Sequence, residues 1–160
     1  MLFDVGDKVV YPHHGAAIVE RREKREVFGE TRDYLVLKLA YGDLTLMVPR
    51  DNCAEVGIRE VCSSEDVEGV LDILRTGESS TQGNWSRRFK GNIERLQSGD
   101  IFQVAEVVRD LTVRDREKGL SAGEKRMLQR SRQILVSELV LACHCDEGKA
   151  ILLVDEALES

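Results

Sequence analysis

The chain has 160 residues, 42% of them hydrophobic and 32% charged, which is ordinary composition for a soluble globular protein and excludes disorder on a large scale. Its formal net charge of −6 argues against a protein that coats nucleic acid through its overall charge. The N-terminus has no basic region followed by an apolar run, and no apolar stretch could span a membrane, so we expect a cytoplasmic protein with no membrane partner.

The first 50 residues predict a small β-sheet. Short segments alternate with a period near two, and the breaks between them fall at Gly15 and at residues 28–30 and 41–43. The expected strands cover residues 7–11, 16–21, 25–28, 33–40 and 44–48, and Pro49 ends the last one. Five strands in so short a stretch imply a small β-barrel or a bent five-stranded sheet, whose edge strand could pair with a partner.

After Ser63 the pattern becomes helical. Ser63 or Ser64 suits a helix N-terminus, and the helix that follows has an apolar stripe at spacings of three and four: Val67, Val70, Leu71 and Leu74. Residues 76–83 are polar and predict a loop. Asn84 then caps a second helix that runs to about Leu96.

Three further helices follow in chain order. Asp100 caps one that Gly119 terminates, residues 121–124 form a capping box for one that runs to about Ala142, and a short helix covers residues 149–158. The chain therefore predicts an α+β fold in which the sheet precedes an all-helical bundle of about five helices. Residues 51–62 contain no obvious flexible linker, so a fixed arrangement of the two halves is expected.

The single tryptophan, Trp85, begins a segment that carries most of the functional signal. Residues 84–90 read Asn-Trp-Ser-Arg-Arg-Phe-Lys, and residues 84–145 hold 12 basic and 8 acidic residues, whereas the rest of the chain is acidic. An apolar wedge beside cations can unstack a base step from the minor groove while the cations hold phosphates. The alternatives are a tryptophan in the core and a solvated helical face of mixed charge.

The cysteines and histidines do not predict a metal or catalytic site. The cysteines have C-x8-C and C-x-C spacings, which differ from the usual zinc motif and favour free thiols at Cys53, Cys62, Cys143 and Cys145. His13 and His14 are adjacent and lack a carboxylate or cysteine at ligand spacing, so packing in a turn is expected. We expect no catalytic residue, metal or cofactor.

Four motifs in the same order resemble the CarD/CdnL family of bacterial transcription regulators. They are Tyr-Pro-His-His-Gly at 11–15, the segment 84–90, Ala-Glu-Val-Val-Arg-Asp-Leu at 105–111, and Gly-Leu-Ser-Ala-Gly-Glu-Lys-Arg-Met-Leu at 119–128. The resemblance implies a Tudor-like domain over residues 1–55 that binds the β subunit of RNA polymerase, similar to the polymerase-binding module of the transcription-repair coupling factor. It also implies a helical DNA-binding domain over residues 63–160.

The resemblance also implies roles for individual residues. In family members the tryptophan wedges into the minor groove at the upstream edge of the transcription bubble, and nearby cations touch the DNA backbone. The expected DNA contacts are Trp85, Arg87, Arg88, Lys90, Lys125, Arg126 and Arg130. On the polymerase side Arg25 matches a family arginine near the start of the third strand, whereas Met47 stands where many relatives have a second arginine.

The residues and the resemblance agree on a regulator that is tethered to RNA polymerase and stabilises the open complex. It is expected to act on promoter DNA at the upstream fork junction. We expect a monomer that is not an enzyme. One alternative is a protein-protein adaptor whose helical half never touches DNA and uses Trp85 as an interface anchor. Another is a zinc or thiol enzyme that depends on the four cysteines.

Overall fold

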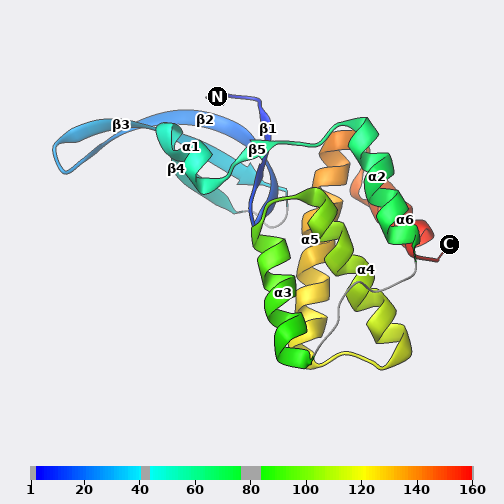
Figure 1. The fold of residues 1–160 in the computed structure, drawn as a ribbon. Helices are drawn as coiled ribbons and strands as arrows, with labels where there is room; N and C mark the ends of the chain where they lie inside the picture. The colour runs from blue at the N-terminus through cyan, green and yellow to red at the C-terminus, as the bar shows by residue number, and fades with distance from the viewer. Residues whose placement is uncertain (1–2, 41–43, 77–83, 160) are drawn as a thin grey trace.

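The structure is a computed structural model that describes residues 3–40, 44–76 and 84–159. In these residues an antiparallel sheet of five strands precedes the main helices, as Figure 1 shows. The strands are β1 (Lys8–Tyr11), β2 (Gly15–Val27), β3 (Glu30–Leu39), β4 (Thr45–Pro49) and β5 (Arg59–Glu60), in the spatial order β4-β3-β2-β1-β5. The predicted α+β class is confirmed, and over the described residues the sheet is bent and open, not a closed barrel.

Two strand predictions need correction. The strands expected at 16–21 and 25–28 are one continuous strand, β2, and the fifth strand of the sheet is β5 in the segment after β4. Residues 20–26 are mostly charged and do not alternate between apolar and polar. This part of β2 pairs with β3 in a hairpin that extends beyond the body of the sheet (Figure 1), so neither of its faces has to be apolar. We call this hairpin, residues 20–33, the arm.

The predicted breaks around the arm have different outcomes. The break at 28–30 is confirmed, because Phe28 and Gly29 both have left-handed backbone angles, with φ of 52° and 80°, as a type I′ hairpin turn requires. The break predicted at 41–43 lies outside the described residues. Pro49 ends β4 as expected.

The expected helices are confirmed in order and close to their expected bounds. They are α2 (Ser64–Arg75), α3 (Trp85–Gln97), α4 (Ile101–Glu117), α5 (Ala122–Cys143) and α6 (Glu147–Glu159). The starts of α2, α3, α4 and α5 follow from their caps, because the N-cap side chain of each accepts a backbone N–H: Ser63, Asn84, Asp100 and Ser121. The sequence pattern missed a 3-10 turn (Arg50–Asn52) and α1 (Cys53–Val56) in the connection between the halves. Most of the loop expected at 76–83 lies outside the described residues.

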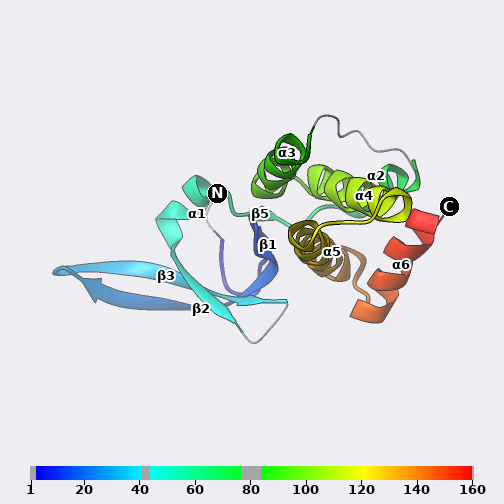
Figure 2. The same cartoon turned by 90° about the horizontal axis from the view of Figure 1, so that it is seen from below.

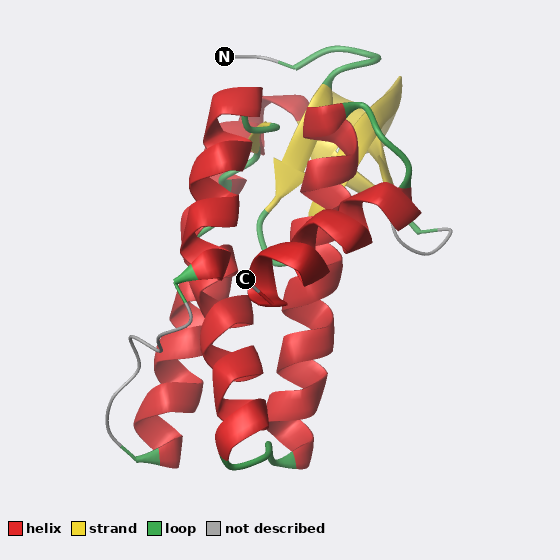
Figure 3. Ribbon diagram, turned by 90° about the vertical axis from the view of Figure 1, so that its right-hand side faces the viewer, coloured by secondary structure: helices red, strands yellow, loops and turns green. Residues whose placement is uncertain are grey.

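Each half has its own apolar core. The sheet and α1 bury a cluster that includes Val9 and Leu37, both without solvent exposure. The helices bury a larger cluster around α4 and α5, in which Val107 and Leu135 have none. Figure 3 shows the sheet at one end of the helices, and Figure 2 shows the arm pointing away from them.

Arg59 in β5 connects the two halves. Its Nη1 and Nη2 donate to the Glu138 carboxylate of α5 at 2.8 and 2.7 Å, and its Nε donates to the Gly99 carbonyl at 2.6 Å. Glu138 is 1% exposed and also accepts the Cys62 N–H at 2.8 Å. Burial, the largest single influence, lowers the pKa of Arg59, but the hydrogen bonds and charge of Glu138 together raise that pKa above its usual value.

A second junction lies where β2 begins. The Ala16 N–H donates to the Ser137 Oγ of α5 at 2.9 Å in a buried hydrogen bond. Gly15 has φ of +93°, and a Cβ built on it would lie 2.8 Å from that Oγ. Only a residue without a side chain fits this close approach of backbone to helix. The two junctions hold the sheet against α5 in one arrangement.

Candidate nucleic-acid interface

Two helices begin at the same end of the bundle, remote from the sheet. Figure 1 shows that α3 and α5 both start at this end and run toward the sheet, while α4 runs in the opposite direction. Asn84 accepts the Arg87 N–H at the start of α3, and Ser121 accepts the Glu124 N–H at the start of α5. The N-termini of helices carry partial positive charge, so this end favours anions before any side chain is counted.

Trp85 lies in the first turn of α3 at this end and is 44% exposed. Its ring stacks on Phe89, with centroids 4.8 Å apart and planes 11° from parallel. Its indole N–H donates to the Ser121 Oγ at 3.2 Å. Phe89 is half-buried and packs against the helical core. Trp85 is therefore a partly exposed ring supported on one face, and not a core residue.

Four of the predicted cations are exposed on the same two helices as this ring. Arg87 and Lys90 follow Trp85 in α3, while Lys125 and Arg126 lie in the first turns of α5. Together with the helix N-termini they add positive charge to the first halves of α3 and α5. We call Trp85 and these four cations the wedge face.

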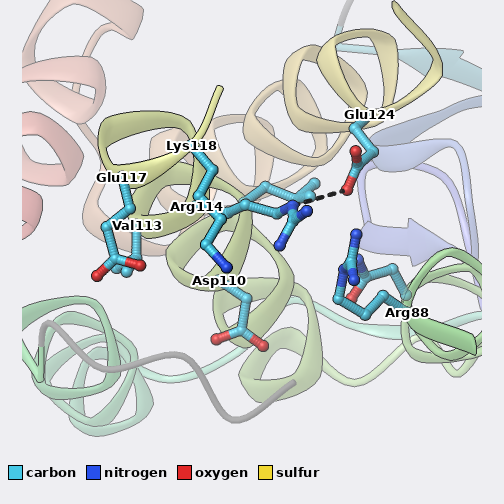
Figure 4. A pocket seen from close by; sticks show the side chains of 9 residues that line it. Arg88, Asp110, Val113, Arg114, Glu117, Lys118 and Glu124 are labelled. Atoms are coloured by element: carbon cyan, nitrogen blue, oxygen red, sulfur yellow. Dashed lines mark ion pairs between the residues drawn. The ribbon is translucent and has the colours of Figure 1, made fainter. Parts of the chain in front are cut away.

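The two remaining predicted cations occupy less exposed positions. Arg88 is half-buried and lines a cavity of about 190 Å³ between α3, α4 and α5, where it and Arg114 lie beside Glu124 (Figure 4). Arg130 is half-buried and donates from Nη2 to the His13 carbonyl at 2.8 Å, which joins α5 to the turn before β2. Arg88 thus lies in an internal cavity, and Arg130 binds a backbone carbonyl of the same chain. The DNA-contact role that the resemblance assigns to both stays a prediction.

The Ser121 and Glu124 side chains were predicted as a capping box, and the structure contains it. No sequence pattern indicated that the Ser121 hydroxyl also contacts Trp85, which is 36 residues away in the chain. Glu124 is 2% exposed, and its Oε2 lies 3.8 Å from the Arg114 Nε of α4. The start of α5 is thus tied to both α3 and α4.

The two residues expected on the polymerase side lie in different strands. Arg25 is exposed in β2, within the arm, and its Nη2 lies 3.3 Å from the Glu23 Oε2. Its position in β2 corrects the expectation that it begins the third strand. Met47 is 38% exposed in the edge strand β4, opposite Val36. Glu23 has a lowered pKa because Arg21 donates a hydrogen bond to it, with a smaller effect from Arg25.

The cysteines are free thiols, and burial shifts the pKa of Cys62 and of His14. All four cysteines are free, and the described part of the chain holds no group of three or more His, Cys, Asp or Glu side chains placed to bind a metal. Burial, followed by the charge of Glu138, raises the pKa of Cys62 to about 12. Burial also lowers the pKa of His14, with a further effect of Arg130. Across the described ranges, no helix combines the length and apolar character needed to cross a membrane.

Comparison with known proteins places both halves of the chain in one family. Residues 69–155 match the family described as "CarD, C-terminal domain", and residues 3–62 match "CarD-like/TRCF RID domain". The chain is 37% identical over 138 residues to the "Putative transcription factor YdeB" of Bacillus subtilis (strain 168), covering 86% of this chain and 90% of that protein. The solution structure of the 72-residue N-terminal domain of Myxococcus xanthus CarD is 29% identical, with a TM-score of 0.32, over 37% of this chain and 79% of that one. From the two domain matches and the full-length relative, the chain belongs to the CarD family.

Proposed function

We propose that this protein regulates transcription initiation by binding the β subunit of RNA polymerase and stabilising the open promoter complex through Trp85 at the upstream edge of the bubble. The exposed Trp85 ring on the wedge face is the observation that carries the proposal. Membership of the CarD family and the name of the Bacillus subtilis relative, "Putative transcription factor YdeB", support a role in transcription.

The geometry of Trp85 suits a wedge at a junction between paired and unpaired DNA. Phe89 covers one face of the ring, so a base can stack only on the other face. Stacking on an aromatic ring contributes about 1–3 kcal/mol per base, and unstacking a base step costs a few kcal/mol. A step that is already open removes most of that cost, so the ring binds an open junction better than closed duplex. Stabilisation of the open state equals this differential affinity.

Charge explains why the protein needs an anchor besides DNA. The whole chain has a net charge of −6, and its positive charge is concentrated in residues 84–145. The four exposed cations of the wedge face neutralise few phosphates, so free binding to DNA is weak at physiological salt. A contact with polymerase raises the local concentration of the wedge face at the promoter and supplies the missing affinity.

The arm and the edge strand β4 provide that contact in the proposal. Beyond residue 19 the edge of β2 that faces away from β3 has no strand partner among the described residues. Strand β4 is an outer strand of the sheet, so its edge away from β3 is also open. Both edges offer backbone groups for pairing with another strand. Arg25 supplies a cation beside the open edge of β2, and Met47 supplies an apolar side chain in β4.

The test of the wedge is the lifetime of open promoter complexes formed by purified RNA polymerase, with no addition, with the protein, and with its Trp85→Ala variant. Coupling of about 1–2 kcal/mol lengthens the lifetime roughly 5- to 30-fold. The variant should not lengthen the lifetime. Its melting temperature should stay within a few degrees of the wild-type value, because the Trp85 ring is partly exposed and is not a core residue. An effect of Trp85→Ala equal to that of the wild type refutes the wedge.

Charge reversal separates a DNA contact from the adaptor alternative. Lys90→Glu and Lys125→Glu should each shorten the lifetime, and the effect should fade as salt is raised. Lys149→Glu is the matched control, since Lys149 is exposed on α6, away from the wedge face (Figure 1). Full activity of both wedge-face variants would favour an adaptor that docks a third protein.

The polymerase contact is tested by binding of the protein to the isolated β subunit. Arg25→Glu should weaken binding, whereas Lys24→Glu should not, because neighbouring residues of a strand point to opposite faces. Met47→Arg should tighten binding by up to about 1.5–3 kcal/mol if it forms a charge-assisted hydrogen bond. Equal effects of Arg25→Glu and Lys24→Glu would place the contact outside this face of the arm.

A further inference from the structure

We infer that Ser121 and Glu124 are positioning residues for the proposed DNA wedge, because the hydroxyl that caps α5 also sets the orientation of the Trp85 ring. The inference rests on the function proposed for Trp85 and adds how the ring is held before DNA arrives. It gives the start of α5 a role in DNA binding that differs from phosphate contact.

The hydrogen bonds of the Ser121 hydroxyl account for its full capacity. A serine hydroxyl can donate one hydrogen bond and accept two. This one donates to the Glu124 Oε1 at 3.1 Å and accepts from the Glu124 backbone N–H at 3.2 Å. The indole N–H of Trp85 takes the second acceptor site, also at 3.2 Å. The hydroxyl therefore cannot turn away from Trp85 without disturbing the cap.

Glu124 determines which way the hydroxyl points. Its Oε1 also accepts the Ser121 backbone N–H at 3.3 Å, so the carboxylate is bound twice by the residue that it orients. It is 2% exposed, and Figure 4 shows Arg88 and Arg114 beside it, with the Arg114 ion pair drawn. A buried carboxylate held from α4 keeps the hydroxyl hydrogen on its own side and leaves an acceptor lone pair toward Trp85.

The ring needs this second restraint because stacking alone does not fix it. The stacked contact with Phe89 limits tilting, but a ring can still turn or slide within its own plane. The N–H bond to Ser121 fixes the in-plane direction. A wedge held in one orientation binds with less ordering than a mobile one.

The test uses the fact that Trp85 is the single tryptophan of the chain, so fluorescence excited at wavelengths that tyrosine does not absorb reports on it alone. Ser121→Gly removes the hydroxyl while keeping a residue that is nearly as good an N-cap. Ser63→Gly is the matched control, because Ser63 caps α2 in the same type of capping box without contacting Trp85. Both variants are compared with the wild type in acrylamide quenching and anisotropy of the free protein, and in open-complex lifetime.

Ser121→Gly should increase quenching and lower the anisotropy of Trp85, and should shorten the lifetime of the open complex by roughly 2- to 10-fold, the effect of one hydrogen bond. Ser63→Gly should change neither readout. Ser121→Thr, which restores the hydroxyl, should return both toward wild type. Trp85→Phe keeps a ring without an N–H, so adding Ser121→Gly to it should shorten the lifetime no further.

Two results separate this inference from the function on which it rests. Wild-type quenching and anisotropy in free Ser121→Gly would overturn the positioning role, whatever the lifetimes show. Looser Trp85 in that variant, together with equal lifetimes for wild type, Ser121→Gly and Trp85→Ala, would support the positioning role and refute the wedge.

Discussion

Replacing Arg59 with methionine is expected to destabilise the protein more than any change at a surface ion pair. Arg59 gives the Glu138 carboxylate two hydrogen bonds, and Glu138 is 1% exposed. Without Arg59 that carboxylate keeps only Cys62 as a partner among the described residues, through its backbone N–H and its thiol. Removing one partner from a buried ion pair costs about 3–5 kcal/mol, a large part of the roughly 5–15 kcal/mol that stabilises a typical domain.

A second arginine provides the matched control. Arg132 lies 2.6 Å from the Asp155 carboxylate, as close as Arg59 lies to Glu138, but the side chain of Asp155 is 46% exposed. Solvent screens such a pair, so Arg132→Met should cost less than about 1 kcal/mol. The two variants match in the length of the contact and differ in the burial of the partner and in the number of hydrogen bonds lost.

Urea unfolding followed by far-ultraviolet circular dichroism measures the difference. With a slope of about 2 kcal/mol per molar urea, Arg59→Met should lower the midpoint by roughly 2 M, and Arg132→Met by less than 0.5 M. Adding Glu138→Leu to Arg59→Met removes the isolated charge and should restore most of the loss, except for about 1–3 kcal/mol from the Cys62 N–H left without its acceptor. Equal midpoints for the two arginine variants would refute the reasoning.

Other changes test single features of the structure. Gly6→Ala should cost about 1–2 kcal/mol through its φ of +91° alone, whereas Gly15→Ala should cost about 1–3 kcal/mol more because its Cβ meets Ser137; equal melting temperatures would contradict the close approach. Phe28→Asn, which suits the left-handed turn better, should raise the melting temperature, corresponding to a gain of about 1 kcal/mol, and a lower value would argue against strain there. Iodoacetamide at pH 8 should modify Cys62 far more slowly in the folded than in the unfolded protein, because a pKa of about 12 leaves roughly one thiol in ten thousand ionised.

Helix starts were predictable because capping is a local interaction. Ser63, Asn84, Asp100 and Ser121 each accept a backbone N–H within three residues of their own position, so the signal lies in the sequence nearby. The arm was not predictable in the same way. Its charged residues are exposed on both faces of a two-stranded ribbon, so burial imposes no alternation on them.

The candidate site was predictable in its residues but not in its contacts. Trp85 and its neighbouring cations stand out in the sequence, whereas the Trp85–Ser121 bond joins helices that pack only in the folded chain. Glu138 is a charged residue within the apolar stretch of α5, where an unpaired charge would be costly. Its position therefore indicates a buried ion pair in the sequence itself. Its partner, Arg59, lies 79 residues earlier and could not be identified from spacing.

The junction between the halves also bears on how the chain folds during synthesis. The ribosome releases β5 before it makes Glu138, the residue that holds Arg59. Glu138 lies 79 residues after Arg59, which takes roughly 4–16 s at about 5–20 residues per second. The Ser137 hydroxyl that receives the start of β2 arrives at the same late stage, 121 residues after Ala16. During that interval the sheet has exposed edges and lacks α5 beside it. The charges along β2 repel other nascent strands from its open edge, so we expect neutralising them to increase aggregation of new chains before it affects the stability of finished ones.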